Sequence, residues 1–377
     1  MNILIISDSY KGCVSSIQAG DALQKGVRAV LPEAETTILP VSDGGEGMLK
    51  AFEKAVGGRF LNIVAHDPFM RPIDTEFLMS EDGSTAYIEI ARTAGLSLLN
   101  KDELNPMLTS TFGVGETVAA ALAAGARNVV MGLGGSSTND AGAGMAEALG
   151  YRFLDANGVA ISGTGEMLAH IQTIDKSNVN KLLAETLFTA ACDVKVPFCG
   201  PQGAACVFAA QKGADEKTIR ILDDGMVHFA RILSDFLGWS VSECLGAGAA
   251  GGLGGALMAL FAARMESGIE LLLRTESFQK ALDRATLIIT GEGRLDSQTS
   301  MGKAVWGILQ EGRKRNIPVF VVAGRVENVE VAMRMGYAGV ELSTPISQEL
   351  ILAMRPEVAM HNISQAAERL VRKWIKR

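Results

Sequence analysis

Short apolar runs alternate with amphipathic helical stretches at both ends of this 377-residue chain. The runs predict strands at residues 2–6, 36–41, 286–290, 317–323 and 338–342. The helical stretches between and after them fall at residues 15–30, 46–56 and 361–376. Strands that alternate with helices in this way form a parallel sheet with helices on both faces. We therefore predict a doubly wound, flavodoxin- or Rossmann-like α/β sheet built from the two ends of the chain.

The middle of the chain has a different pattern, which predicts antiparallel strands. The stretch "IDTEFLMSEDGSTAYIEI" alternates on both sides of Asp82-Gly83, and "YRFLDANGVAI" does so around Asn157-Gly158. Both patterns are typical of β-hairpins. We predict a discontinuous doubly wound domain at 1–65 and 285–377, and an inserted mixed α/β domain at 66–284. A cleft between two domains is the default position for a ligand site.

Composition narrows the class of protein and its partners. The net charge of −7, from 35 basic and 42 acidic residues, does not favour nucleic acid as a partner. The five cysteines include no CxxC pair, which predicts reduced thiols, no zinc site and a cytoplasmic location.

Residues 244–263 carry no charge but hold six glycines, so we expect a buried turn and a core helix, not a membrane span. The sequence leaves a monomer and a homodimer equally open.

The segment "VMGLGGSSTNDAGAGM" (130–145) follows a predicted strand at 127–131 and leads into a predicted helix at 138–149. Consecutive glycines let another group approach the backbone, and a helix start supplies N–H donors for phosphate. The predicted phosphate-binding residues are Gly132, Gly134, Gly135, Ser136, Ser137, Thr138 and Asn139. The alternative is structural, with Ser137 and Asp140 forming a capping box at the helix start.

Two further features of the sequence bear on the cofactor. Asp140 is an unsuitable neighbour for phosphate unless a divalent cation separates the two, which points to Mg²⁺. A GxGxxG pattern at Gly246, Gly248 and Gly251 raises NAD as an alternative. However, no convincing strand precedes the pattern, as a dinucleotide fold requires. Close packing of a helix, or approach of the backbone to a small anion, is the favoured interpretation there.

Three polar loops are predicted to follow strands of the doubly wound sheet: "SDSYKG" (7–12), "SDGGEG" (42–47) and "GEGRLDSQ" (291–298). Loops after parallel strands meet at one edge of the sheet, where ligands bind. Their charged residues are Asp8, Lys11, Asp43, Glu46, Glu292, Arg294 and Asp296. A fourth cluster, at 191–214, sets Asp193 after the strand "TLFTA" and contains Lys212. The alternative for each cluster is a solvated cap or turn.

Six stretches, in this order, resemble the bacterial glycerate kinases that phosphorylate D-glycerate. The stretches are "SDSYKG", "PVSDGGEG", "MGLGGSSTNDAGAGM", "CDV…P…GPQGAACVF…QKGA", "GAGAAGGLGGAL" and "TGEGRLDSQTSMGKA". The departures from the family's usual residues fall at Cys13, Val196, Ala209, Ala210 and Val305, and the charged positions are kept. The resemblance implies a two-domain α/β fold, MgATP as phosphoryl donor and 2-phosphoglycerate as product.

On the basis of this resemblance, we hypothesise roles for several of these polar residues. The loop at 132–139 would bind the phosphates of ATP, and Mg²⁺ would be held by some of Asp140, Glu292 and Asp296. Lys11 and Arg294 would hold the glycerate carboxylate or the transferring phosphoryl group. Asp193 would deprotonate the C2 hydroxyl, with Asp43 as the second choice.

Three other functions stay open at this point. A kinase that acts at C3, or on another small hydroxy acid, would use the same chemistry. An NAD-dependent oxidoreductase and a non-catalytic nucleotide sensor are the more distant alternatives.

Overall fold

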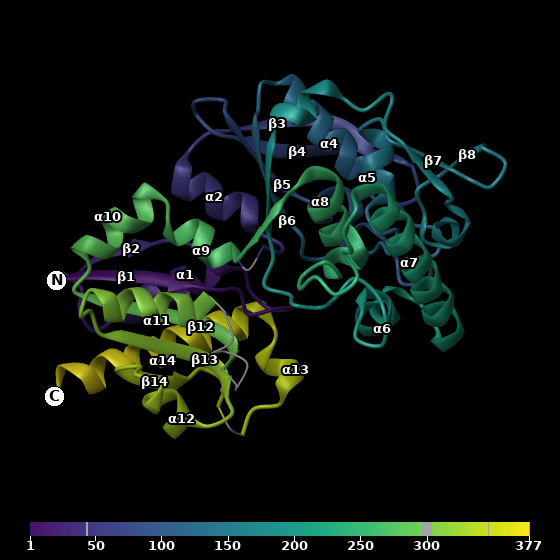
Figure 1. Cartoon of the computed structure of the whole chain (residues 1–377). Coiled ribbons are helices and arrows are strands. Elements are labelled where there is room, and N and C mark those ends of the chain that lie inside the picture. Colours follow the sequence, from purple (N-terminus) through teal and green to yellow (C-terminus); the bar gives the residue numbers. More distant parts are fainter. Residues whose placement is uncertain (43, 296–303, 346, 377) are drawn as a thin grey trace. The chain divides into compact units, whose positions relative to one another are not determined.

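The computed structural model describes residues 1–42, 44–295, 304–345 and 347–376 and contains two compact units (Figure 1). Unit 1 comprises Met1–Asp43, Lys50–Val56 and Gly268–Arg377, and unit 2 comprises Gly44–Leu49 and Gly57–Ser267. These bounds differ from the predicted limits at 65/66 and 284/285. The first limit differs because β3 (Arg59–His66) pairs within the sheet of unit 2. The second differs because residues 268–284, which form two helices, belong to unit 1.

Unit 1 contains a five-stranded sheet in which every pairing is parallel. Its strands are β1 (Asn2–Ser7), β2 (Glu35–Ile38), β12 (Leu287–Leu295), β13 (Val319–Val326) and β14 (Gly339–Leu342). The order β2-β1-β12-β13-β14 is the 2-1-3-4-5 order of flavodoxin-like folds. The predicted doubly wound α/β sheet is therefore confirmed.

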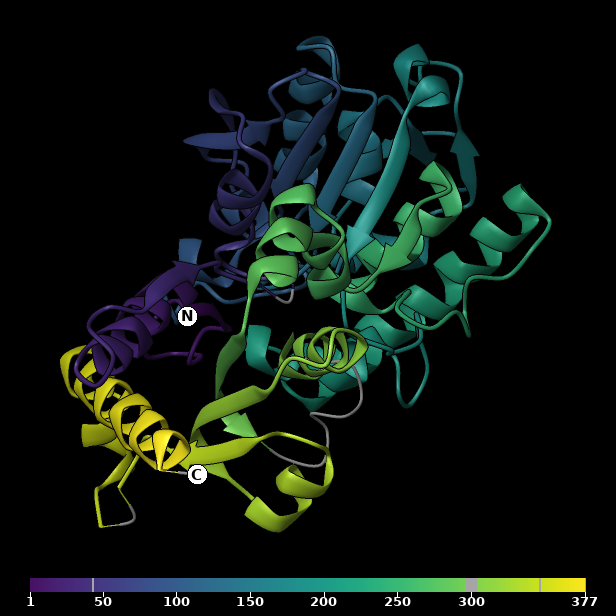
Figure 2. The ribbon, with the colours of Figure 1, turned by 90° about the vertical axis from the view of Figure 1, so that its left-hand side faces the viewer.

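Helices cover both faces of this sheet. Helices α1 (Ser16–Arg28) and α14 (Pro356–Ile375) lie side by side on the face that carries Leu287 and Phe320 (Figure 2). Helix α11 (Ala304–Lys314) packs through Gly312 against Val319 and Ile288. Because successive residues of a strand point to opposite faces, α11 lies on the other side of the sheet. The other helices described in unit 1 are α9 (Gly268–Leu273), α10 (Glu276–Arg284), α12 (Val329–Arg334), α13 (Leu350–Ala353) and all but the first two residues of α2 (Met48–Val56).

Unit 2 contains a mixed six-stranded sheet in the order β11-β10-β6-β5-β4-β3. Its other strands are β4 (Pro72–Met79), β5 (Thr85–Glu89), β6 (Asn128–Gly132), β10 (Leu187–Ala191) and β11 (Arg264–Glu266). A smaller antiparallel sheet consists of β7 (Arg152–Leu154), β8 (Ala160–Ile161) and β9 (Thr173–Asp175). The pairs β4–β5 and β7–β8 are antiparallel, so both predicted hairpins are confirmed.

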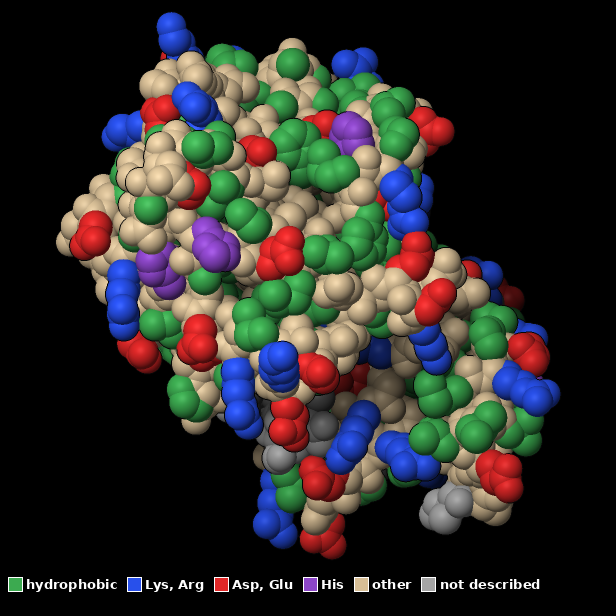
Figure 3. All heavy atoms as spheres, turned by 90° about the vertical axis from the view of Figure 1, so that its right-hand side faces the viewer, with side chains coloured by type: hydrophobic (Ala, Val, Ile, Leu, Met, Phe, Trp, Pro, Cys, Tyr) green, Lys and Arg blue, Asp and Glu red, His purple; other side chains and the backbone are tan. Residues whose placement is uncertain are grey.

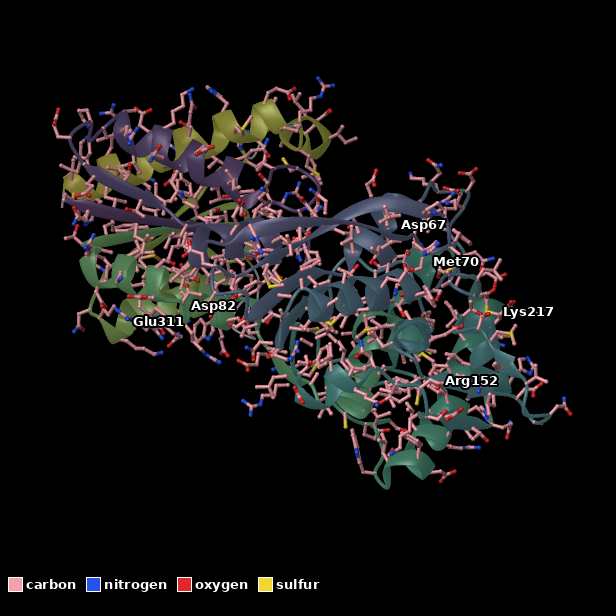
Figure 4. All side chains as sticks on the ribbon, turned by 90° about the horizontal axis from the view of Figure 1, so that it is seen from above. Asp67, Met70, Asp82, Arg152, Lys217 and Glu311 are labelled. Carbon is pink, nitrogen blue, oxygen red and sulfur yellow. The ribbon has the colours of Figure 1, made fainter. Side chains whose placement is uncertain are left out.

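The turn between β3 and β4 shows how a buried carboxylate can fix an unusual backbone. Asp67 accepts hydrogen bonds from the backbone N–H groups of Phe69 and Arg71 and from Arg71 Nε. Met70, which lies in the same turn, has a φ of 62° (Figure 4). An L-residue with a side chain seldom adopts this left-handed conformation unless its surroundings hold it there.

The helices of unit 2 include α3 (Ala91–Ala94), α4 (Phe112–Ala123), α5 (Ala143–Ala148), α6 (Ala204–Phe208), α7 (Glu216–Leu237) and α8 (Leu253–Phe261). The apolar stretch at 244–263 forms a glycine-rich turn followed by α8, as predicted. Over the described ranges, no helix combines the length and the apolar character that crossing a membrane requires.

Candidate active site

Four neighbouring strands of unit 2 end at the same level. In the strand register, Glu89 of β5 pairs with Gly132 of β6, Gly132 with Ala191 of β10, and Ala191 with Glu266 of β11. All four strands run parallel, so the loops that follow them leave the sheet at one edge. The loop after β6 is the predicted phosphate loop, and the loop after β10 carries Asp193.

Backbone atoms of another segment of the chain pack closely against Gly132 and Gly134. A Cβ at Gly132 would lie 2.5 Å from the carbonyl oxygen of Gly44, and one at Gly134 would lie 2.4 Å from the Cα of Gly45. The N–H of Gly134 donates to the carbonyl of Gly44 (3.0 Å). These two glycines are therefore required by internal packing, whereas Gly135, with φ +77°, is exposed.

The loop after Gly135 does not become helical where the sequence predicts. Helix α5 begins at Ala143, not at residue 138, and has only six residues. Ser137 does not cap it, because its hydroxyl donates to the carbonyl of Ala94 (3.0 Å). The capping-box alternative is therefore wrong, and so is the expectation that a helix start lies at the glycine loop. The residues from Ser136 to Asp140 instead form a buried irregular segment.

Asp140 anchors this segment. Its carboxylate accepts hydrogen bonds from Thr111 N and Oγ1 (both 2.7 Å), Gly142 N (3.1 Å) and Gly144 N (3.2 Å). Burial raises the pKa of the Asp140 carboxyl, and these hydrogen bonds act in the opposite direction. A carboxylate has about four lone-pair sites. Because protein donors already use this number, the contacts favour an anchoring role over the predicted binding of Mg²⁺.

Lys212 contacts the same loop. The sequence did not predict a role for it. Its side chain is almost fully buried, and Nζ donates to the carbonyl of Thr138 (2.5 Å) and lies 3.4 Å from Ser136 Oγ. Burial lowers the pKa of Lys212 to about 7, and the nearby charge of Asp140 partly offsets this decrease. The small apolar neighbours in "FAAQKGA" were the one sequence signal that this lysine is buried.

The GxGxxG pattern has a structural explanation. A Cβ at Gly248 would lie 2.2 Å from the carbonyl oxygen of Pro197, and one at Gly251 would lie 2.0 Å from that of Thr138. No strand lies between Leu237, the last residue of α7, and the pattern; the chain there forms bends, coil and turns. The pattern is therefore closely packed, but against carbonyl groups of irregular segments and not against a helix, and contacts within the protein account for the feature that favoured NAD.

Unit 1 places its predicted site residues at the point where the strand order reverses, between β1 and β12. Asp8 follows β1, and its N–H donates to the carbonyl of Gly291 (2.9 Å). Strand β12 continues to Leu295, so Glu292 and Arg294 lie in a strand and not in the predicted loop. Glu292 is buried, whereas Arg294 and Lys11 are exposed. Ligands of open α/β sheets bind at such reversal points.

Of the remaining predicted residues, the structure describes Asp193. Asp193 lies two residues beyond the end of β10 and is half-buried. Asp43 and Asp296 lie outside the described residues. Across the described ranges, no three or more His, Cys, Asp or Glu side chains are grouped so as to hold a metal ion. On the face shown in Figure 3, basic and acidic side chains are interspersed, and neither sign predominates.

Taken together, the fold defines an α/β protein whose described polar loops follow parallel strands, a common arrangement in enzymes that bind phosphorylated ligands. Comparison with known proteins gives the family. The model of the glycerate kinase family matches residues 3–375, and the chain belongs to this family. It is therefore an enzyme of the kinase class.

Individual relatives agree with this assignment. A glycerate kinase from Bacillus cereus is 39% identical over 375 residues, which cover 99% of this chain and 98% of the relative. A glycerate 2-kinase from Escherichia coli is 40% identical over 324 residues, 86% of this chain and 85% of the relative. A crystal structure described as glycerate kinase 2 from Salmonella typhimurium LT2 has a TM-score of 0.84 at 35% identity. That comparison covers 100% of this chain and 98% of the other.

Proposed function

We propose that the protein transfers the γ-phosphoryl group of ATP to the C2 hydroxyl of D-glycerate, which gives 2-phosphoglycerate and ADP. The observation that carries the proposal is the family match over residues 3–375. The choice of C2 is supported by the name of the E. coli relative, a glycerate 2-kinase. Transfer to C3, or to another small hydroxy acid, is the second candidate because it needs the same phosphate loop.

The loop at 132–139 is the proposed site for the ATP phosphates, with a narrower set of contacts than the sequence predicted. In the described part of the chain, the backbone N–H groups of Gly135 and Ser136 donate to no protein acceptor. The N–H groups of Gly134, Ser137 and Thr138 already have acceptors. Backbone N–H groups at a glycine turn bind phosphate well. We therefore assign the phosphate contact to Gly135 and Ser136.

Phosphoryl transfer depends mainly on positioning and on neutralising charge. Asp193 is the proposed base, which would accept the proton of the C2 hydroxyl as the oxygen attacks the γ-phosphorus. Lys11 and Arg294 are the proposed partners of the glycerate carboxylate or of the transferring group. Mg²⁺ would neutralise the phosphate oxygens, and Glu292 is the described carboxylate we propose for it, with Asp296 as the second.

The test is ADP release by the purified protein with MgATP, with and without D-glycerate, followed by phosphorus NMR of the product. We expect release that depends on D-glycerate and a product spectrum of 2-phosphoglycerate. A spectrum of 3-phosphoglycerate would replace C2 by C3. Release that D-glycerate does not increase would refute glycerate as the substrate. Chelation of divalent cations should abolish turnover, and full turnover without them would refute the Mg²⁺ assignment.

A further inference from the structure

Lys212 is unusual among the basic residues of the protein. It is 2% exposed, and no other lysine or arginine in the described ranges is buried. It ends the short helix η4 (Ala210–Lys212), directly before Gly213, which has φ +98°. Burial of an ammonium group is costly unless hydrogen bonds and opposite charge compensate for it. An apolar side chain of similar length would fill the same space without this cost.

Within the described residues, both hydrogen-bond acceptors of the buried ammonium group belong to the phosphate loop. Nζ donates to the carbonyl of Thr138 (2.5 Å) and lies 3.4 Å from Ser136 Oγ, while Asp140 provides the nearby negative charge. Ser136 Oγ also accepts the N–H of Thr138 (3.1 Å) and lies 3.0 Å from Thr138 Oγ1. The hydroxyl of Ser136 therefore connects Lys212 to both ends of the segment 136–138.

We propose that Lys212 is a positioning residue for phosphoryl transfer, which holds the segment 136–138 so that the N–H groups of Gly135 and Ser136 are ready to bind the nucleotide phosphates. This inference rests on the proposed function. Lys212 touches neither substrate and acts through Thr138 and Ser136. Donors that are fixed before binding stabilise developing charge without the cost of reorganising the site.

A merely structural lysine would give a different pattern from a positioning one. Loss of a structural contact lowers the free energy of unfolding and leaves the affinity of each substrate unchanged in the molecules that remain folded. Loss of a positioning contact weakens nucleotide binding in particular, because only the phosphate donors are displaced. Binding of ADP, measured directly, separates the two without any need for turnover.

The experiment compares four variants by titration calorimetry with MgADP, thermal unfolding and steady-state kinetics. Lys212→Met removes the charge at similar length, Lys212→Arg restores it with a different shape, and Ser136→Ala removes the connecting hydroxyl. Thr117→Ala is the matched control, because the buried Thr117 hydroxyl bonds the carbonyl of Gly113 within α4 (2.9 Å).

We expect Lys212→Met to raise the Kd of MgADP and the KM of ATP about tenfold, since a hydrogen bond from a charged group is lost. Lys212→Arg should recover part of this affinity, and Ser136→Ala should shift Kd in the same direction as Lys212→Met. The KM of glycerate should change by less than about twofold on this account, because only the nucleotide contacts are altered. Thr117→Ala should keep the wild-type Kd.

A wild-type Kd for MgADP in Lys212→Met would overturn the inference, and so would an equal loss in Thr117→Ala. If Lys212→Met does not fold, Ser136→Ala decides, and a wild-type Kd in that variant overturns the inference. Failure of the proposed function would look different. The wild-type protein would then show no D-glycerate-dependent ADP release, whatever the variants do to ADP binding.

Discussion

Two glycine-bearing regions of the molecule follow parallel strands but are built differently. In unit 2, the segment 132–142 is buried from Ser136 onward and is fixed by Asp140, Lys212 and the backbone of Gly44-Gly45. In unit 1, Lys11 in the loop after β1 and Arg294 near the end of β12 carry exposed charges. The difference suggests that the first region supplies fixed geometry and the second supplies charge. Substitutions in the first should lower stability, and those in the second should change substrate binding alone.

The largest expected effect is that of Asp140→Ala. The substitution leaves four buried donors, on Thr111, Gly142 and Gly144, without their acceptor. Removal of one partner from a buried charged network costs about 3–5 kcal/mol. We expect the free energy of unfolding, measured in urea, to fall by about this amount.

Asp82→Ala is the control for this prediction, because Asp82 also accepts hydrogen bonds from several donors but lies exposed in the β4–β5 turn (Figure 4). We expect it to lower the free energy of unfolding far less than Asp140→Ala, because water can replace the lost acceptor at an exposed position. If the two variants lose the same stability, burial is not what makes Asp140 an anchor.

Asp193→Asn should affect catalysis and leave stability unchanged. A general base typically contributes about 10²–10⁴-fold to the rate. We expect kcat to fall within this range, with little change in the KM of glycerate and an unchanged unfolding midpoint. Asp193 belongs to unit 2, so this variant tests whether the edge of that sheet contributes chemistry as well as geometry. A fall in kcat of only a few-fold would be much smaller than the loss of a general base causes. That result would remove Asp193 from the role.

The same glycine-to-alanine change in the two regions should have unequal effects. At Gly134 the new methyl would lie 2.4 Å from the Cα of Gly45, and such overpacking costs about 1–3 kcal/mol. At Gly293 in β12 its nearest neighbour would be 3.5 Å away, an ordinary contact. We therefore expect Gly134→Ala to lower the urea midpoint clearly and Gly293→Ala to leave it nearly unchanged. Equal midpoints would show that the cover by Gly44-Gly45 is not a constraint.

Lys11→Ala should give the smallest effect and only on substrate binding. Lys11 is exposed, so the free energy of unfolding should be unchanged. If Lys11 holds the glycerate carboxylate, the KM of glycerate should rise about tenfold, the value of one charge-assisted hydrogen bond. Lys25→Ala, at an exposed position of α1 in the same unit, serves as control. An unchanged KM in Lys11→Ala would show that Lys11 is only a surface charge.

The sequence predicted the features that depend on local pattern. The strands of the doubly wound sheet, both hairpins and the position of the glycine loop follow from periodicity and turn residues. The features that the sequence did not predict depend on contacts between segments that are far apart in the sequence. Nothing near Gly134 indicates that Gly45 packs against it, and nothing near Asp140 indicates that Thr111 supplies two of its donors. The late start of α5 has the same cause, because Asp140 accepts from Thr111 in a distant segment as well as from Gly142 and Gly144 at the start of the helix.

The most direct test of this account is a crystal structure of the protein with Mg²⁺ and a non-hydrolysable ATP analogue. We predict phosphate oxygens within hydrogen-bond distance of the backbone nitrogens of Gly135 and Ser136, with Lys212 still bonded to the carbonyl of Thr138. Phosphates bound elsewhere, with these two N–H groups still lacking an acceptor, would contradict the assignment of the glycine loop as the phosphate site.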